Sequence, residues 1–128
     1  MGNNRGRVMA SRRDIRVKRV YDAAEPSDGV RVLVDRLWPR GVGKDSARLD
    51  AWLKALAPSA PLRRWLHVDP TTRWSEFAKR YRVELAAQRA ALEELRRLAR
   101  GKHLTLVTAV ADVEHSHVPV LLRALETR

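Results

Sequence analysis

The chain has 128 residues, of which 45% are apolar and none is cysteine, and a formal net charge of +11. This length and composition are typical of one globular domain rather than of a disordered chain. No apolar run approaches the roughly 20 residues of a membrane-spanning helix. The absence of cysteine excludes disulfides, thiolate nucleophiles and cysteine-ligated zinc. No apolar stretch of signal-peptide length follows the basic start, so we expect a cytoplasmic location.

About half of the excess positive charge lies near the N-terminus, where residues 1–19 carry seven basic side chains and one acidic side chain. We expect a flexible basic arm over residues 1–13 and a single α/β domain over residues 14–128. A basic arm favours polyanions, so an anionic small molecule or nucleic acid is the predicted kind of partner, and a membrane is not. The alternative is that arginine serves only as a solubilising residue. The sequence predicts no oligomeric state.

The first half of the chain predicts two strands and two short helices. Residues 15–21 alternate apolar and basic side chains, which is typical of an edge strand. After a turn over residues 22–29, residues 30–37 contain the continuous apolar run of a buried strand, which ends at Pro39 and Gly41. Residues 49–57 have apolar side chains at helical spacing. Ser59 and Pro61 are typical of the start of another helix, which we expect to run through Leu66.

The second half predicts a helix over about residues 72–99, in which Ala86 and Ala87 mark a candidate kink and Gly101 is the stop. Residues 104–110 form the third predicted strand, and residues 113–125 a closing helix that Pro119 weakens near its start. Strands separated by helices predict a small three-layer α/β domain with a short, mainly parallel sheet flanked by helices. We expect strands two and three to be central neighbours. Ligands of such sheets bind beyond the carboxyl ends of the strands, which indicates the loops 35–43 and 109–117.

The first of these loops combines a carboxylate with two guanidinium groups. Arg36 and Arg40 offer planar forks of donors that suit phosphate or carboxylate, and Gly41 leaves room for an anion beside them. Asp35 could act as a base or could pair with either arginine and merely fix the loop.

The second loop carries the chain's closest pair of histidines. If Asp112 caps a helix, His115 falls in its first turn, where an anion is favoured and a neutral imidazole suits acid–base work. Asp35, His115 and His117 are therefore the candidate catalytic residues. Ser116 lies between the histidines, but no nucleophile-elbow motif surrounds it. Asp112 with His115, or Glu114 with His117, has a better spacing for a metal than the two histidines have. The alternatives are a helix cap and ordinary surface histidines, and we expect neither a metal nor a cofactor.

Three further residues are weaker candidates. His67 stands in a segment that is either a third site loop or simply a helix break, Tyr81 fits the core, and Glu84 is placed to pair with an arginine. The four tryptophans could stack on bases, but three of them have the spacing of core residues.

The chain resembles domain-of-unknown-function family 488, in its YeaO-like branch, over roughly residues 17–126. The resemblance rests on these segments: Val34-Asp35-Arg36-Leu37-Trp38-Pro39-Arg40-Gly41, Arg64-Trp65, His67-Val68-Asp69-Pro70, Trp74-Ser75-Glu76-Phe77, Tyr81-Arg82-Val83-Glu84-Leu85 and Asp112-Val113-Glu114-His115. It implies a small α/β fold with two signature loops and assigns no function. The family's second loop often reads Glu-His-Cys-His-Arg. Here Ser116 replaces the cysteine and Val118 the arginine, which argues against thiol chemistry and leaves Arg36 and Arg40 to supply the charge.

The leading hypothesis is an enzyme-like pocket for a phosphate-bearing anion such as a nucleotide or a nucleic-acid end. In it Arg36 and Arg40 hold the anion, Asp35 orients or acts as base, and His115 or His117 moves protons. The rival hypotheses are a non-catalytic nucleic-acid-binding or regulatory module, and an interaction protein whose signature loops are structural.

Overall fold

Four parallel strands form one sheet in the computed structural model, which describes residues 15–126. The strand order is β1-β4-β2-β3, with the bounds β1 Ile15–Arg19, β2 Val30–Leu33, β3 Ala51–Trp52 and β4 Leu104–Thr108. In the register of the central pair, Leu106 of β4 lies beside Val32 of β2, and on its other side beside Val17 of β1. The predictions of a parallel sheet, of a β1 edge strand and of central neighbours β2 and β4 are confirmed. The basic arm predicted over residues 1–13 lies outside the described residues.

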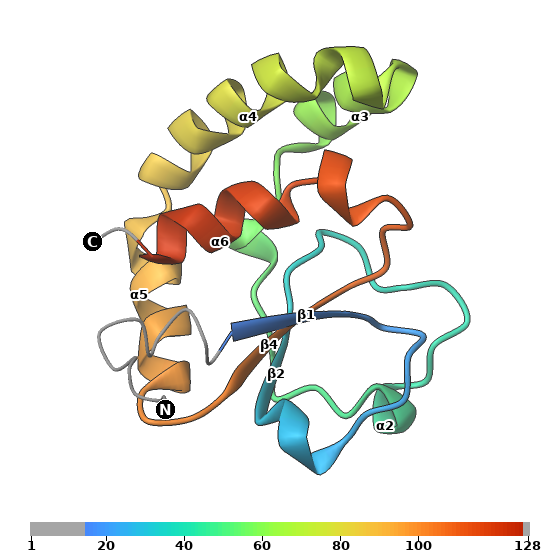
Figure 1. Ribbon diagram of the computed structural model, residues 1–128, viewed down its shortest axis with the longest axis vertical. Helices are drawn as coiled ribbons and strands as arrows, with labels where there is room; N and C mark the ends of the chain where they lie inside the picture. The colour runs from blue at the N-terminus through green and yellow to red at the C-terminus, as the bar shows by residue number, and fades with distance from the viewer. Residues whose placement is uncertain (1–14, 127–128) are drawn as a thin grey trace, which may run out of the picture.

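Most of the helices cover one face of this sheet (Figure 1). The α-helices are α2 Lys44–Ala47, α3 Ala60–Val68, α4 Pro70–Ala86, α5 Arg89–Ala99 and α6 Val118–Glu126, and the short 3-10 helices are η2 Pro26–Asp28, η3 Lys54–Leu56 and η4 Val113–His115. Ser59 caps α3 by accepting a hydrogen bond from the amide of Leu62, and Pro61 occupies its first turn, as the sequence predicts. No helix between residues 15 and 126 is long and apolar enough to cross a bilayer.

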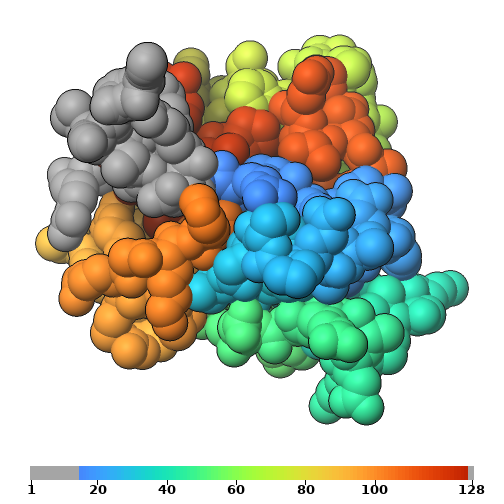
Figure 2. Space-filling model, turned by 60° about the horizontal axis from the view of Figure 1, so that its bottom comes forward, coloured from blue at the N-terminus to red at the C-terminus, as the bar shows by residue number. Residues whose placement is uncertain are grey.

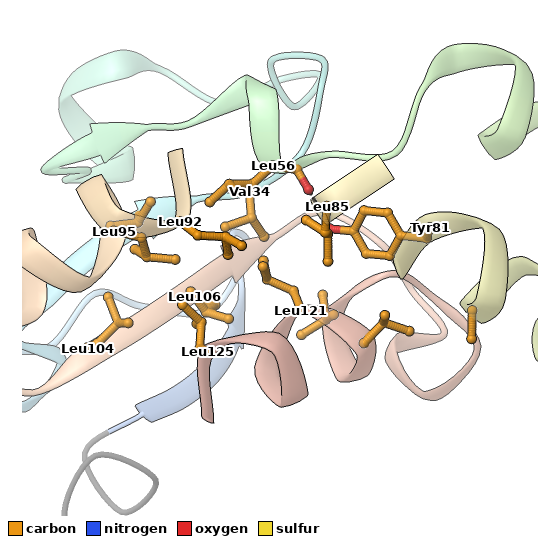
Figure 3. Close-up of a cluster of buried hydrophobic side chains, with 14 of the residues drawn as sticks. Val34, Leu56, Tyr81, Leu85, Leu92, Leu95, Leu104, Leu106, Leu121 and Leu125 are labelled. Atoms are coloured by element: carbon orange, nitrogen blue, oxygen red, sulfur yellow. Dashed lines mark hydrogen bonds between the residues drawn. The ribbon is translucent and has the colours of Figure 1, made fainter. Parts of the chain in front are cut away.

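Apolar side chains of alternate strand residues point to opposite faces and build two clusters. The larger cluster joins Val32 and Leu106 to the buried sides of α3, α4, α5 and α6, and Figure 3 shows Tyr81, Leu85 and Leu121 of these helices packed together. The smaller cluster lies on the other face and joins strand residues to the segment 38–52. The molecule is therefore an α/β domain with three layers, whose thinner outer layer is an irregular segment with one short helix, α2.

A buried ionic cluster fixes the start of β2 and holds this thinner layer in place. The Asp28 carboxylate is fully buried and lies 2.9 Å from the Lys18 ammonium and 2.7 Å from the Arg31 guanidinium. Arg31 also donates a hydrogen bond to the Ala47 carbonyl of α2 at 2.9 Å. Next to Asp28, Gly29 has a φ of +67°, and a Cβ there would lie 2.3 Å from the His103 carbonyl oxygen. In Figure 2 the chain from β1 to β2 (blue) crosses the middle of the molecule above the segment of α2 and β3 (teal to green).

The prediction of a helix over residues 49–57 is wrong. Ala51 and Trp52 form strand β3 beside Val32 and Leu33, and only the 3-10 turn Lys54–Leu56 follows. Pairing with β2 satisfies backbone groups that the edge of β2 would otherwise expose, and the segment divides its apolar side chains between the two clusters as a strand does.

The other boundaries differ from the predictions by shorter amounts. Strand β2 ends at Leu33 and β4 at Thr108, so residues 34–37 and 109–110 belong to loops. The single helix predicted over residues 72–99 is two helices, which separate at Ala87 and Gln88, next to the candidate kink. The closing helix begins only at Val118, because Pro119 has no amide hydrogen and fits the first turn of a helix rather than its interior.

Candidate functional site

The loops that follow β2 and β4 meet at one end of the sheet and form a cleft of about 460 Å³. Parallel strands deliver their carboxyl ends to the same edge, which is the right-hand edge in Figure 1. The sequence-predicted residues that line the cleft are Asp35, Arg36, Arg40, His67, Asp112, His115, Ser116 and His117. Gly41, Tyr81, Glu84 and Glu114 are not among its lining residues.

Asp35 ties the two loops together. Its carboxylate accepts hydrogen bonds from the Thr108 hydroxyl at 2.7 Å and from the Ala109 amide at 2.8 Å, both at the end of β4. The Nε2 atom of His117 lies 3.3 Å from the same carboxylate and 3.0 Å from the Val34 carbonyl. A carbonyl only accepts, so Nε2 carries a hydrogen and is the donor. Asp35 is therefore engaged with β4 and His117.

These contacts set the protonation state of Asp35. Burial alone raises the pKa of this carboxyl, but the hydrogen bonds from His117, Ala109 and Thr108 favour the ionised form more strongly. The net effect lowers the pKa of Asp35 below its ordinary value. The carboxylate is negative at neutral pH, and it is a weak base.

Arg36 and Arg40 do not pair with Asp35. The Arg36 guanidinium donates to the Pro58 carbonyl at 3.1 Å and to the Ala57 carbonyl at 3.4 Å, which orients it but leaves its charge without a counter-ion among residues 15–126. Arg40 is exposed, and within residues 15–126 its one hydrogen bond uses its backbone carbonyl, which accepts from the Tyr21 hydroxyl at 3.5 Å. Gly41 has a φ of +77°, so it serves the turn of this loop.

A third arginine, which the sequence analysis missed, lines the same cleft. Arg63 of α3 is half-buried, and its Nε atom is buried without a hydrogen-bond partner among the described residues. It lies four residues before His67, so the two side chains share the helix face that borders the cleft. The spacing from His67 is the available sequence signal, and it distinguishes Arg63 from its neighbour Arg64 only once the side of α3 that borders the cleft is known.

Asp112 and His115 form a pair at the cleft's second loop. The Asp112 carboxylate caps η4 by accepting from the His115 amide at 3.3 Å, and its other oxygen lies 2.8 Å from the His115 Nδ1 atom. The hydrogen bond with His115 lowers the pKa of Asp112. The His115 ring is about one-third exposed and stands edge-on to Trp74 at 6.5 Å between ring centroids. Asp112 therefore caps the turn that contains His115, which is one of the alternatives that the sequence leaves open, and that turn is a 3-10 helix.

The Ser116 hydroxyl is occupied by helix capping. It donates to the Val113 carbonyl at 2.6 Å and accepts from the Val118 amide at 3.1 Å, so it joins η4 to α6. Both roles of the hydroxyl are used by backbone groups, and no base contacts it within residues 15–126. This geometry argues against Ser116 as a nucleophile. Glu114 is exposed in η4, outside the cleft lining.

Tyr81 and Glu84 support the cleft from behind. Tyr81 is fully buried, donates its hydroxyl hydrogen to the Leu56 carbonyl and meets the His117 ring edge-on. Burial, together with the charges of Glu84 and Asp35, raises the pKa of Tyr81, which keeps the phenol protonated. Glu84 accepts hydrogen bonds from the Ser59 amide at 2.8 Å and the Ser59 hydroxyl at 2.6 Å, rather than pairing with an arginine.

Metal ligation finds no support in this geometry. Within residues 15–126, no three histidine or acidic side chains are grouped closely enough to hold an ion.

The four tryptophans are all half-buried. Trp38 stands edge-on to Trp52, and the guanidinium groups of Arg73 and Arg80 lie 4.7 Å and 4.4 Å from the centroid of the Trp65 ring.

Comparisons with known proteins place the chain among uncharacterised relatives. A family model described as the inactive DUF488-N3 subclade matches residues 14–128. Uncharacterised proteins of Mycobacterium bovis and Mycobacterium tuberculosis are 49% identical to the chain over 114 residues, which cover 89% of it and 95% of each relative. The uncharacterised protein YeaO of Escherichia coli is 41% identical over 108 residues, which cover 84% of the chain and 93% of that protein. The search of solved structures gives no significant match.

Proposed function

This chain belongs to the DUF488 family, and from that premise we propose that it is a non-catalytic binding protein whose cleft holds a phosphate-bearing anion such as a nucleotide. The observation that carries the proposal is the Arg63 guanidinium. Its Nε atom is buried in the wall of the cleft and has no hydrogen-bond partner among the described residues. A buried donor without a partner is costly, and a small rotation of the Arg63 guanidinium toward an anion in the cleft would satisfy it.

The balance of charge in the cleft supports the same conclusion. The cleft is lined by Arg36, Arg40 and Arg63 and by only two carboxylates, Asp35 and Asp112. Each carboxylate already contacts an imidazole, Asp35 that of His117 and Asp112 that of His115. None of the three guanidinium groups pairs with a carboxylate within residues 15–126, and their planar forks match phosphate oxygens.

Two features favour binding over catalysis. The subclade whose model matches the chain is described as inactive. The groups that a reaction would need are committed to the fold: the Ser116 hydroxyl caps α6, and Asp35 holds β4. A catalytic role remains the second candidate because of one contact, that between Asp112 and the partly exposed His115, since a carboxylate that orients an imidazole is the arrangement of a general base.

Calorimetric titration with inorganic phosphate and with adenosine monophosphate at fixed ionic strength tests the proposal. Arg63→Ala should weaken binding by about 10-fold or more, since a hydrogen bond to a charged group contributes about 1.5–3 kcal/mol. Arg63→Lys should restore only part of the affinity, because the lysine lacks the planar fork. Arg64→Ala is the matched control, since Arg64 is the exposed neighbour on the same helix and is absent from the cleft lining.

Equal affinity in all four proteins would place the anion outside the cleft and overturn the proposal. Chromatography of the nucleotide recovered after titration separates the two candidate functions. Intact nucleotide is expected for a binding protein, whereas turnover that His115→Ala abolishes would establish the catalytic alternative.

A further inference from the structure

A second concave surface lies between α4, α5 and α6, and none of its lining residues lines the cleft. This groove has a volume of about 1000 Å³. Its basic side chains are Lys79 and Arg82 of α4, Arg89 and Arg96 of α5, and Arg123 of α6, and its only acidic lining residue is Glu93. Three separate helices thus contribute cations to one surface.

Three of these cations have no partner in the part of the chain that the structure describes. Arg96 lies 2.9 Å from Glu93, but Lys79, Arg82 and Arg89 are exposed and make no hydrogen bond or ion pair through their side chains within residues 15–126. Other exposed arginines of α4 and α5, outside the groove, do have counter-ions. Arg80 pairs with Glu76 at 3.1 Å and Arg97 with Glu94 at 2.5 Å. Glu76 and Glu94 thus pair with arginines outside the groove, and the cations inside it remain concentrated on one surface. Such a concentration of positive charge suits a polyanion.

An aromatic ring also lines the groove. Trp74 of α4 lines it, and its indole Nε1 hydrogen is donated to the Ser116 carbonyl at 2.8 Å, which fixes the ring in place. The ring is half-buried, so part of it remains accessible. Cations that follow a groove beside a fixed aromatic ring are the combination that binds unpaired nucleotides, since phosphates meet the cations and a base stacks on the ring. An acidic peptide would use the cations alone, and a duplex hides the faces of its bases.

We propose that the groove between α4, α5 and α6 binds single-stranded nucleic acid, with Lys79, Arg82 and Arg89 on the phosphates and Trp74 beneath a base. This surface shares no lining residue with the anion cleft, and either proposal can fail without the other. Sequence specificity is not required for such binding, because every base has a stacking face and every nucleotide a phosphate.

Fluorescence anisotropy with a labelled deoxythymidine 12-mer, measured over a series of salt concentrations, tests this proposal on the full chain. The double variant Arg82→Ala/Arg89→Ala should bind at least 10-fold more weakly than the unmodified protein at low salt. The slope of log affinity against log salt should become shallower by about 1.4, since each phosphate contact on a single strand contributes about 0.7. Arg64→Ala/Arg100→Ala removes the same charge from exposed arginines outside the groove, and its slope should change far less.

The same titrations contain the outcomes that would overturn the proposal. Equal losses in the two double variants would mean that binding follows net charge rather than the groove. Competition by polyglutamate as effective as by the unlabelled 12-mer would assign the groove to acidic peptides, and equal competition by a duplex would remove the role of the aromatic ring.

Discussion

The Asp35 carboxylate lies 3.3 Å from the Nε2 atom of His117, so the loop after β2 and the residue just before α6 are fastened to each other at the buried side of the cleft. His117 is 6% exposed and also donates to the Val34 carbonyl. The pair accordingly belongs to the supporting wall of the cleft, whereas the proposed function assigns the anion to the three arginines. In the proposed function, Asp35 and His117 are therefore positioning residues rather than the catalytic residues that the sequence predicts.

The stability that Asp35 contributes should depend on pH. Its pKa is lowered in the folded protein, so the unfolded chain binds the proton first as the pH falls. The contribution is therefore fully present above the ordinary carboxyl range near pH 4 and is lost as the pH falls through the folded-state value. Asp35→Asn should lower the free energy of unfolding by about 2 kcal/mol at pH 7, since hydrogen bonds to a charged group are lost. Urea unfolding at pH 7 and in steps below pH 4 measures the difference between the two proteins, which should shrink with acid.

Asp45→Asn is the matched control for this series. Asp45 is exposed and makes no hydrogen bond or ion pair through its side chain within residues 15–126. Its substitution should change stability by less than about 0.5 kcal/mol at either pH. A difference between Asp35→Asn and the unmodified protein that stays constant into acid would show that the ionised form of Asp35 is not the source of its stabilisation.

Ser116→Ala should affect stability and leave ligand binding unchanged. The hydroxyl bridges the Val113 carbonyl and the Val118 amide, so its removal leaves one amide of the first turn of α6 uncapped. A cost of about 1 kcal/mol in the free energy of unfolding is typical of such a cap. Urea unfolding measures the loss and calorimetry with phosphate the affinity, with the exposed Ser75→Ala on α4 as control. A loss of phosphate affinity with no loss of stability would restore a direct role for the Ser116 hydroxyl.

The central part of the sheet could be predicted from the sequence because its signal is physical and local. Residues 32–34 and 104–107 are continuous or nearly continuous apolar runs, as a parallel strand buried on both faces requires. The helix prediction for residues 49–57 was wrong because the apolar side chains at 49, 52, 53 and 56 have helical spacing. The observed strand is only two residues long, which is too short to give a strand pattern. The segment forms a strand because it pairs with the edge of β2. That edge lies elsewhere in the sequence, so no local pattern in residues 49–57 predicts the pairing.

The candidate site was predictable to the level of its loops. The carboxyl-end rule placed Asp35, Arg36, His115 and His117 around one cleft, which is where the structure has them. The pairing of these residues was not predictable, because it depends on side-chain directions: Asp35 contacts His117 rather than an arginine. Arg63 was missed for a related reason. Which of the adjacent arginines of α3 faces the cleft depends on how α3 packs against α4, and the sequence contains that packing only indirectly.

Glu84 connects the stability of α3 to the proposed anion site. Its carboxylate accepts from both the amide and the hydroxyl of Ser59 at the N-terminus of α3, and Arg63 follows one turn later. A negative charge at a helix N-terminus is stabilising, and here it also fixes the start of the helix that carries Arg63. Glu84→Gln should lower the free energy of unfolding by about 1–2 kcal/mol, because a neutral amide makes weaker hydrogen bonds and interacts less with the helix dipole.

The same substitution should weaken phosphate binding several-fold, although Glu84 does not line the cleft. Glu76→Gln is the matched control, since Glu76 lies on the same helix in an exposed pair with Arg80, and its removal should change neither quantity measurably. Urea unfolding and phosphate calorimetry on both variants distinguish the possible roles. If Glu84→Gln lowers stability and leaves phosphate affinity intact, Arg63 does not need a fixed helix start to hold the anion. If it raises the affinity instead, the charge of Glu84 is felt by the anion directly, and the carboxylate must be counted among the charges of the cleft.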